Sequence, residues 1–147
     1  MADETYAPPW RERDLTNPVD VLARTLYGEA RGEGTHGMRA VACTIRNRAN
    51  NPRWWGKDIV TVCLKPWQFS VWNQGDPNRA KILAATIRDR MFPEALEVAR
   101  DTVAGRLPQL TNRSDHYHTK AVRPIWSRGK TPVATIGGHL FFRLEIR

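Results

Sequence analysis

Residues 17–33 read NPVDVLARTLYGEARGE, which predicts a capped helix that ends in a glutamate among glycines. Asn17 suits the N-cap, and Pro18 suits the first helical position because no N–H donor is needed there. Apolar residues then recur at helical spacing: Val19, Leu22, Ala23 and Leu26. We therefore predict a helix with one buried face that approaches its end at residues 27–29.

Similar signals predict helices further along the chain. After a turn containing glycines, a second helix should bury one face: Met38, Val41, Ala42, Ile45 and Ala49. The turn itself contains Gly32, Gly34 and Gly37. Asp76 and Pro77 begin a third helix, aligned on Ala80, Leu83, Ala84, Ile87 and Met91. Pro93 begins a fourth helix, for which Gly105 suits the C-terminal cap.

Two segments near the C-terminus, residues 133–136 and 139–144, are rich in β-prone residues and predict a small β element. Residues 59–64 fit either a short helix or a strand, and residues 68–70 are read as extended. We therefore predict a mainly α (α+β) fold, with an extended arm over residues 1–16 and a single domain over residues 17–147.

Composition fits one compact domain. The chain has 147 residues, a hydrophobic fraction of 41% and six tryptophans, enough for a real core.

No apolar run approaches the roughly 20 residues that span a bilayer, so we expect no stable membrane insertion. Residues 1–10 lack the basic and apolar regions of a secretory signal, so we expect none. The two cysteines form no CxxC pair, and Cys43 is expected to be a buried free thiol.

The net charge of +8 favours anionic partners, because 23 Lys and Arg stand against 15 Asp and Glu. A basic module that binds nucleic acid or other polyanions is therefore the rival hypothesis from another functional class. The positive residues are scattered, and no zinc-finger, RNP or basic-zipper pattern accompanies them, so we expect no nucleic-acid partner.

Glu29 is the main candidate for acid–base chemistry. It follows an apolar helix face and precedes a glycine-rich turn, so a rigid support projects it near a break in the structure. Tyr27 and nearby tryptophans can supply apolar walls, which would raise the carboxyl pKa toward that of a general acid. The alternative is a solvated helix-end glutamate, or one paired with Arg31.

Glu33 is a candidate second carboxylate, and it would share a face with Glu29 if the helix continued. The alternative is that Glu33 caps the next helix or pairs with an arginine.

Aromatic residues concentrate in one segment: Trp54, Trp55, Trp67, Phe69 and Trp72. Aromatic rings stack on the apolar faces of sugars but also fill cores, and we expect about half of them in the core. In an extended segment, Gln68 and Ser70 would share a face that offers hydrogen bonds.

In a strand, His116 and His118 would point to the same side. They would then suit sugar binding or packing, or, with a third ligand, zinc. We expect no metal and no cofactor.

The run YGEARGE at residues 27–33 resembles the signature of SleB-like cell-wall hydrolases. The resemblance continues in the same order through blocks at residues 37–42, 47–48, 66–70, 115–118, Trp126 and 136–142. It implies a lysozyme-like fold and cleavage of the N-acetylmuramic acid–N-acetylglucosamine bond of peptidoglycan, with Glu29 as the acid. On this basis residues 17–147 form the catalytic domain. The expected substrate-binding residues are Tyr27, Trp67, Gln68, Phe69, Ser70, His116, Tyr117 and His118.

The resemblance favours a lytic transglycosylase that forms 1,6-anhydro products. The runner-up is a hydrolytic muramidase in which Glu33 or Asp115 positions water, and a zinc amidase is a third hypothesis. Spore members of the family carry a wall-binding repeat that these residues lack. We therefore expect a monomeric phage endolysin that stays in the host cytoplasm until it is released to the cell wall. Its basic surface would bind anionic envelope polymers.

Overall fold

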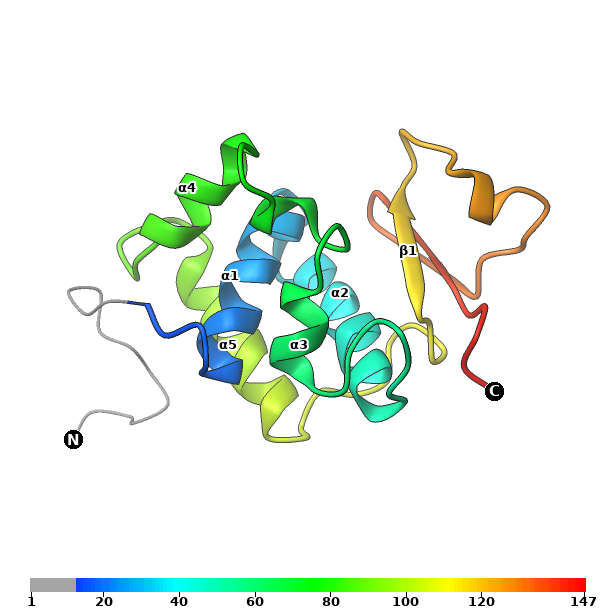
Figure 1. Ribbon diagram of the computed structural model, residues 1–147, viewed down its shortest axis with the longest axis horizontal. Helices are drawn as coiled ribbons and strands as arrows, with labels where there is room; N and C mark the ends of the chain where they lie inside the picture. Colours follow the sequence, from blue (N-terminus) through cyan, green and yellow to red (C-terminus); the bar gives the residue numbers. More distant parts are fainter. Residues whose placement is uncertain (1–12) are drawn as a thin grey trace.

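The computed structural model describes residues 13–147, which form a helical body flanked by a small antiparallel sheet (Figure 1). The helices are α1 (Pro18–Ala30), α2 (Gly34–Asn50), α3 (Ile59–Leu64), α4 (Pro77–Ala84) and α5 (Phe92–Val103). Short 3₁₀ turns are η1 (Arg31–Glu33), η2 (Ser70–Trp72) and η3 (Ile125–Ser127). The strands are β1 (His116–Thr119), β2 (Ala134–Ile136) and β3 (His139–Phe142).

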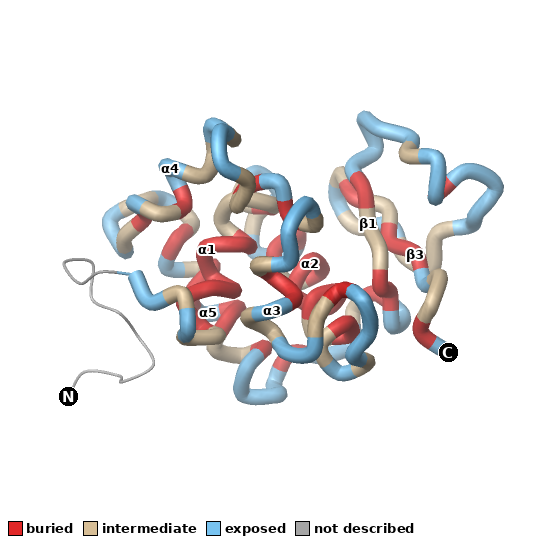
Figure 2. The backbone as a smooth tube through the Cα atoms, in the orientation of Figure 1, coloured by how far each residue is buried: buried red, intermediate tan, exposed pale blue. Residues whose placement is uncertain are grey.

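Helix α1 lies at the centre of the helical body and packs against α2, α3, α4 and α5. It begins as predicted: the Asn17 side chain accepts hydrogen bonds from the backbone N–H groups of Val19 and Asp20, at 2.9 and 3.2 Å. Its apolar face is fully buried at Leu22 and Leu26. Figure 2 shows this buried centre, with the exposed residues on the outer loops. The helix therefore gives the body a rigid core element that leads directly to Glu29.

Three sequence predictions about local structure are wrong: two concern helix limits and one concerns an extended segment. Helix α2 begins at Gly34, so Gly37 lies inside it rather than in the preceding turn. Helix α4 ends at Ala84, and Met91 is the left-handed residue that precedes α5, with φ of 75°. Residues 68–70 are not an extended segment, because Trp67 has φ of 69° and the chain turns there before entering η2.

The early end of α4 has a tertiary cause. Arg24 of α1 pairs with Asp20 at 3.1 Å and donates to the carbonyls of Ile82 and Ala85, at 2.6 and 3.1 Å. These carbonyls lie at the helix end, where intrahelical partners run out. A buried guanidinium thus satisfies the end of α4, and the aligned residue Ile87 is left exposed.

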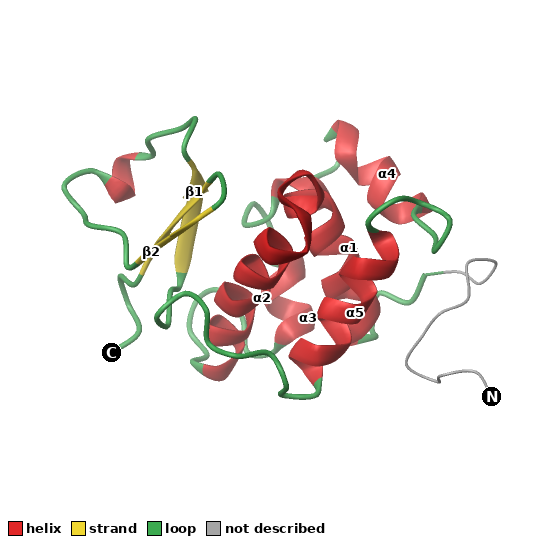
Figure 3. Cartoon of the chain, turned by 180° about the vertical axis from the view of Figure 1, so that it is seen from behind, coloured by secondary structure: helices red, strands yellow, loops and turns green. Residues whose placement is uncertain are grey.

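Residues 59–64, which the sequence left open between a short helix and a strand, form helix α3, and Asp58 caps it through reciprocal bonds with Thr61. The prediction of a small β element is confirmed. The β-prone segments are β2 and β3, and β1 pairs with β3 so that the strand order is β1-β3-β2. Figure 3 shows the sheet from behind, beside the end of the helical body. The mainly α (α+β) prediction holds. Most of the predicted arm, residues 1–12, lies outside the described residues.

No helix within residues 13–147 has the length and apolar character needed to cross a membrane.

Candidate active site

A cavity of about 270 Å³ lies between the helical body and strand β1. It is lined by Glu29, Arg48, Trp67, Gln68, Phe69, His116, Tyr117 and Trp126. These residues come from α1, from α2, from the turn before η2, from β1 and from η3. Segments far apart in the sequence therefore meet around one glutamate.

Glu29 lies in the last turn of α1 and reaches across to the sheet. Its Oε1 accepts a hydrogen bond of 2.5 Å from the hydroxyl of Tyr117 on β1. Burial raises the pKa of Glu29; the Tyr117 hydrogen bond opposes this effect, and the negative charge of Asp76 adds to it. The alternative pairing with Arg31 does not form, because Arg31 donates instead to the Tyr27 carbonyl and to Asn78. Glu29 is thus a partly buried carboxyl group with an enhanced tendency to hold its proton.

Tyr117 is suited to be a fixed donor. Burial and the adjacent Glu29 raise its pKa well above the ordinary value, so the phenol keeps its proton. Its ring lies 5.7 Å from that of Phe141, 5.2 Å from His139 and 6.5 Å from Phe69. Aromatic packing therefore holds the hydroxyl at Glu29.

Arg48, which the site prediction missed, lies beneath the cavity with only 6% of its surface exposed. Its Nε donates to the Asp115 carbonyl at 2.6 Å, and Nη1 donates to Gln68 Oε1 at 3.4 Å. The guanidinium lies over the rings of Trp54 and Trp55, with centroids at 5.5 and 5.2 Å. Arg48 thus joins β1 to the turn that carries Gln68. The Asn47-Arg48 block was the sequence signal for it.

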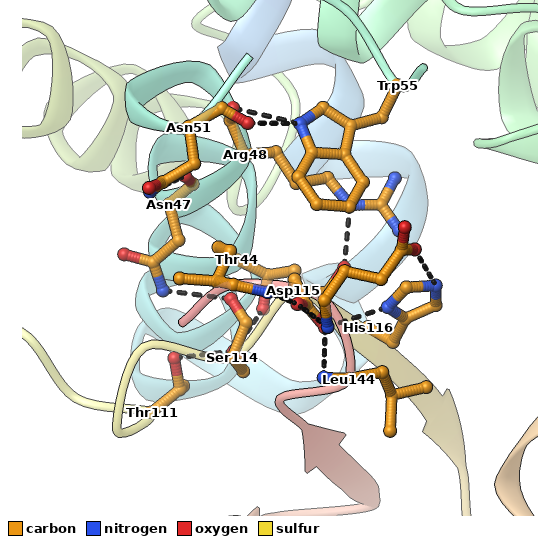
Figure 4. Close-up of polar contacts among 12 residues, drawn as sticks. Thr44, Asn47, Arg48, Asn51, Trp55, Thr111, Ser114, Asp115, His116 and Leu144 are labelled. Atoms are coloured by element: carbon orange, nitrogen blue, oxygen red, sulfur yellow. Dashed lines mark hydrogen bonds and ion pairs between the residues drawn. The ribbon is translucent and has the colours of Figure 1, made fainter. Parts of the chain in front are cut away.

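Asp115 anchors the start of β1 to the C-terminal segment (Figure 4). Its carboxylate accepts from the backbone N–H groups of Leu144, Glu145 and Ile146 at 2.8, 2.7 and 2.8 Å. His116 Nδ1 lies 2.8 Å from the same carboxylate. Burial alone would raise the pKa of Asp115, but these hydrogen bonds hold it well below its usual range. Asp115 is fully buried and committed to these contacts.

Glu33 does not face Glu29, because α1 ends at Ala30 and the chain turns through η1. Its Oε2 accepts instead from the backbone N–H of Gly138, in the turn between β2 and β3, at 2.9 Å. Glu33 is absent from the cavity lining. The condition for a carboxylate pair, an α-helix that continues from Glu29 through Glu33, is not met.

The structure gathers some of the predicted binding residues and not others. Trp67, Gln68, Phe69, His116 and Tyr117 join Glu29 around the cavity, together with Arg48 and Trp126. The predicted residues outside its lining are Tyr27, Ser70 and His118. The ring of Tyr27 packs on Phe92 at 5.5 Å, and that of His118 stacks on Phe142 at 5.2 Å.

The aromatic cluster divides between core and surface, as expected. Trp55 and Phe69 are buried. Trp67 is 81% exposed and Trp126 is 37% exposed, although both border the cavity. Open indole faces at the rim are a suitable surface for stacking on sugar rings.

The other chemical candidates show no arrangement for catalysis. Both Cys43 and Cys63 are buried free thiols, as predicted for Cys43. Burial raises the pKa of Cys63 to about 12, which disfavours a thiolate. Within residues 13–147, no three His, Cys, Asp or Glu side chains are grouped to hold a metal ion.

Replacing Tyr117 with Phe is expected to raise the pKa of Glu29. The phenol stabilises the ionised carboxylate, so removing the hydroxyl leaves burial less opposed. The pKa is measured by NMR titration of the Glu29 carboxyl carbon. Tyr27→Phe is the matched control, since Tyr27 packs on Phe92. An unchanged or lowered Glu29 pKa in Tyr117→Phe contradicts this assignment. Other charged or titratable groups around Glu29 are Arg48, Cys63, Asp76 and His116.

Comparison with known proteins identifies relatives over most of the chain. A family model described as Cell Wall Hydrolase matches residues 32–142, a range that begins just after Glu29. The spore cortex-lytic enzyme of Bacillus subtilis (strain 168) is 25% identical over 128 residues, covering 85% of this chain and 37% of the relative. The spore cortex-lytic enzyme of Halalkalibacterium halodurans is 26% identical over 127 residues, covering 85% and 34%. The chain thus spans about a third of the length of these relatives.

Two solved structures share the fold. The catalytic domain of the germination-specific lytic transglycosylase SleB from Bacillus anthracis aligns with a TM-score of 0.66 and 20% identity, covering 95% of this chain and 98% of that one. The catalytic domain of the Bacillus cereus SleB protein gives a TM-score of 0.67 at 20% identity, covering 95% and 97%. This likeness agrees with the lysozyme-like α+β fold predicted from the sequence.

Proposed function

The chain belongs to the cell wall hydrolase family, and from this premise we propose that it cleaves the glycan strands of peptidoglycan with Glu29 as the catalytic acid. The observation that carries the proposal is the partly buried Glu29 in the cavity, held by the Tyr117 hydroxyl at 2.5 Å. A carboxyl group with a raised pKa keeps more of its proton near neutral pH, as a general acid must.

The proposed reaction is a lytic transglycosylation at the bond between N-acetylmuramic acid and N-acetylglucosamine. Protonated Glu29 gives its proton to the glycosidic oxygen, the bond from that oxygen to C1 of the muramic acid breaks, and N-acetylglucosamine leaves as an alcohol. The C6 hydroxyl of the same muramic acid then attacks C1 and gives its proton to the Glu29 carboxylate. The product is a 1,6-anhydro sugar, and the acid is regenerated.

This route fits the surroundings of Glu29 because it needs a single carboxyl group. The other candidate carboxylates are engaged elsewhere: Asp115 by three backbone N–H groups and His116, and Glu33 by Gly138. Among the described residues, Glu29 is the carboxylic acid in the cavity lining. A hydrolytic muramidase remains the runner-up, and it would require a group other than these two to orient the water.

The cavity rim supplies contacts suited to a glycan strand. Trp67 and Trp126 present exposed ring surface for stacking, and Gln68 presents a side-chain amide for hydroxyl or acetamido groups. Positive surface charge would favour adsorption to anionic envelope polymers.

The proposal is tested with purified sacculi incubated with the full chain. We expect turbidity to fall and soluble muropeptides with new muramic acid ends to appear. Free stem peptides with intact glycan strands would contradict it in favour of an amidase, as would activity lost on chelation with EDTA. Salt-sensitive binding to sacculi or DNA without any released fragment would contradict it in favour of a polyanion-binding module.

A further inference from the structure

The sheet is fastened to the helical body at both ends of strand β1. At its start, Thr44 of α2 lies 2.7 Å from the Ser114 hydroxyl, and Asn47 donates to the Ser114 carbonyl at 2.9 Å (Figure 4). At the opposite end, Glu33 accepts from the backbone N–H of Gly138 at 2.9 Å. The Glu29–Tyr117 hydrogen bond lies between these two attachments along the strand.

Gly138 connects Glu33 to the end of β1 through two backbone hydrogen bonds. Its N–H donates to Glu33, and its carbonyl accepts from the N–H of Lys120, directly after β1, at 2.8 Å. Thr119, the last residue of β1, pairs with His139 of β3. The Glu33 carboxylate is therefore linked through one residue to the end of the strand that carries Tyr117.

Glycines from two elements lie against the Glu33 side chain, which is exposed to solvent on its other side. A Cβ atom on Gly137 or Gly138 would collide with a carboxylate oxygen of Glu33. A Cβ atom on Gly37, in the first turns of α2, would collide with the Glu33 side-chain carbons. Glycine inside a helix costs about 1 kcal/mol in stability relative to alanine. The space that Gly37 leaves for the Glu33 side chain therefore has an energetic cost. The absence of a side chain at these three positions leaves room for the Glu33 carboxylate to reach the Gly138 N–H.

We propose that Glu33 is a positioning residue: its carboxylate holds the β2–β3 turn, and through it strand β1, where the Tyr117 hydroxyl meets Glu29. This inference rests on the proposed role of Glu29. The two glutamates leave the same junction, Glu29 from the end of α1 and Glu33 from η1, and they contact the sheet at two separate points. Glu33 serves the reaction without touching the substrate.

The chemistry at Gly138 requires an acceptor oxygen and not a negative charge. Glutamine at position 33 keeps such an oxygen, whereas alanine removes it. A second catalytic carboxylate would instead be lost equally in both variants. Glu33→Gln and Glu33→Ala therefore distinguish positioning from direct participation in the reaction.

The test compares kcat and KM for soluble glycan oligomers, over a range of pH, in these variants and in Tyr117→Phe. We expect Glu33→Ala to lower kcat about tenfold with little change in KM, since small misplacements near a reacting group are costly. The alkaline limb of its pH–kcat profile should move to higher pH, as in Tyr117→Phe. The reason is that Glu29 loses the hydrogen bond that favours its ionised form. We expect Glu33→Gln to retain most of the activity and the original limb.

Three further variants complete the experiment. Glu97→Ala, on the exposed face of α5, is the matched control and should behave as wild type. Gly138→Ala keeps the Glu33 carboxylate in the chain, but the added Cβ would push that carboxylate away from the Gly138 N–H. It should therefore reproduce the shift of the alkaline limb of the pH–kcat profile even if Glu33→Ala fails to fold. Glu33→Gln as inactive as Glu33→Ala, or an unshifted limb in Gly138→Ala, would overturn the inference. Glu29→Gln is assayed in parallel, and activity there overturns the proposed function itself.

Discussion

Glu29→Gln is expected to abolish the release of soluble muropeptides from purified sacculi, with a rate loss of about 10²- to 10⁴-fold. Glutamine has nearly the same shape and still accepts the Tyr117 hydrogen bond, but it cannot donate the carboxyl proton. The measurement is the initial rate of fragment release at equal concentrations of folded protein. Glu97→Gln is the matched control, because Glu97 is exposed on α5. A Glu29→Gln rate within a few-fold of wild type contradicts the role of Glu29.

The same variant should be more stable than wild type at neutral pH. Because the folded-state pKa of Glu29 is raised, its favourable contribution is present below the unfolded pKa and is lost as pH rises through the folded value. Glutamine is not subject to this loss. The Tm advantage of Glu29→Gln should therefore be largest near pH 7 and shrink as pH falls into the ordinary range of glutamate. A lower Tm at pH 7 would argue against a desolvated carboxylate.

Asp115→Asn is expected to cause the largest loss of stability, about 3 kcal/mol or more in the free energy of unfolding. Asp115 is fully buried and accepts from three consecutive backbone N–H groups that follow β3. An amide offers only one acceptor oxygen, and its NH₂ group would face donors. The measurement is denaturant unfolding at pH 7. Asp101→Asn, which removes an exposed ion pair with Arg106, is the control and should cost little.

The pH dependence of the Asp115 effect follows from the depressed pKa. Its stabilising contribution is present above the unfolded pKa and is lost as pH falls toward the folded value. The stability gap between wild type and Asp115→Asn should therefore be full at neutral pH and narrow in acid. A gap equal to that of Asp101→Asn, or one that widens in acid, contradicts this role.

Sequence reasoning succeeded where local chemistry decides the structure. Asn17, Pro18 and the apolar face starting at Val19 specify α1 without help from the rest of the chain. The end of α4 could not be predicted in that way, because Arg24 satisfies its carbonyls from another helix. The turn at Trp67 was also missed, since a bulky residue rarely adopts a positive φ.

The site was predicted in part for similar reasons. The helix and the family resemblance both pointed to Glu29, but helical geometry directs Tyr27, two residues earlier, to another side. Arg48 belongs to one of the blocks that resemble the family, but that block gave it no role, and the fold is what places it at the cavity. Glu33 was a candidate because it lies close to Glu29 along the chain. Its contact in the structure is instead with a turn about a hundred residues away.

The most direct test of the proposed reaction is a mass spectrum of the muropeptides released when sacculi are digested in H₂¹⁸O. In the proposed route the C6 hydroxyl of the muramic acid replaces water, so no solvent oxygen enters the product. We predict unlabelled 1,6-anhydro muramic acid ends that resist borohydride reduction. Muramic acid ends that carry one solvent oxygen and are reduced by borohydride would show hydrolysis and contradict the route.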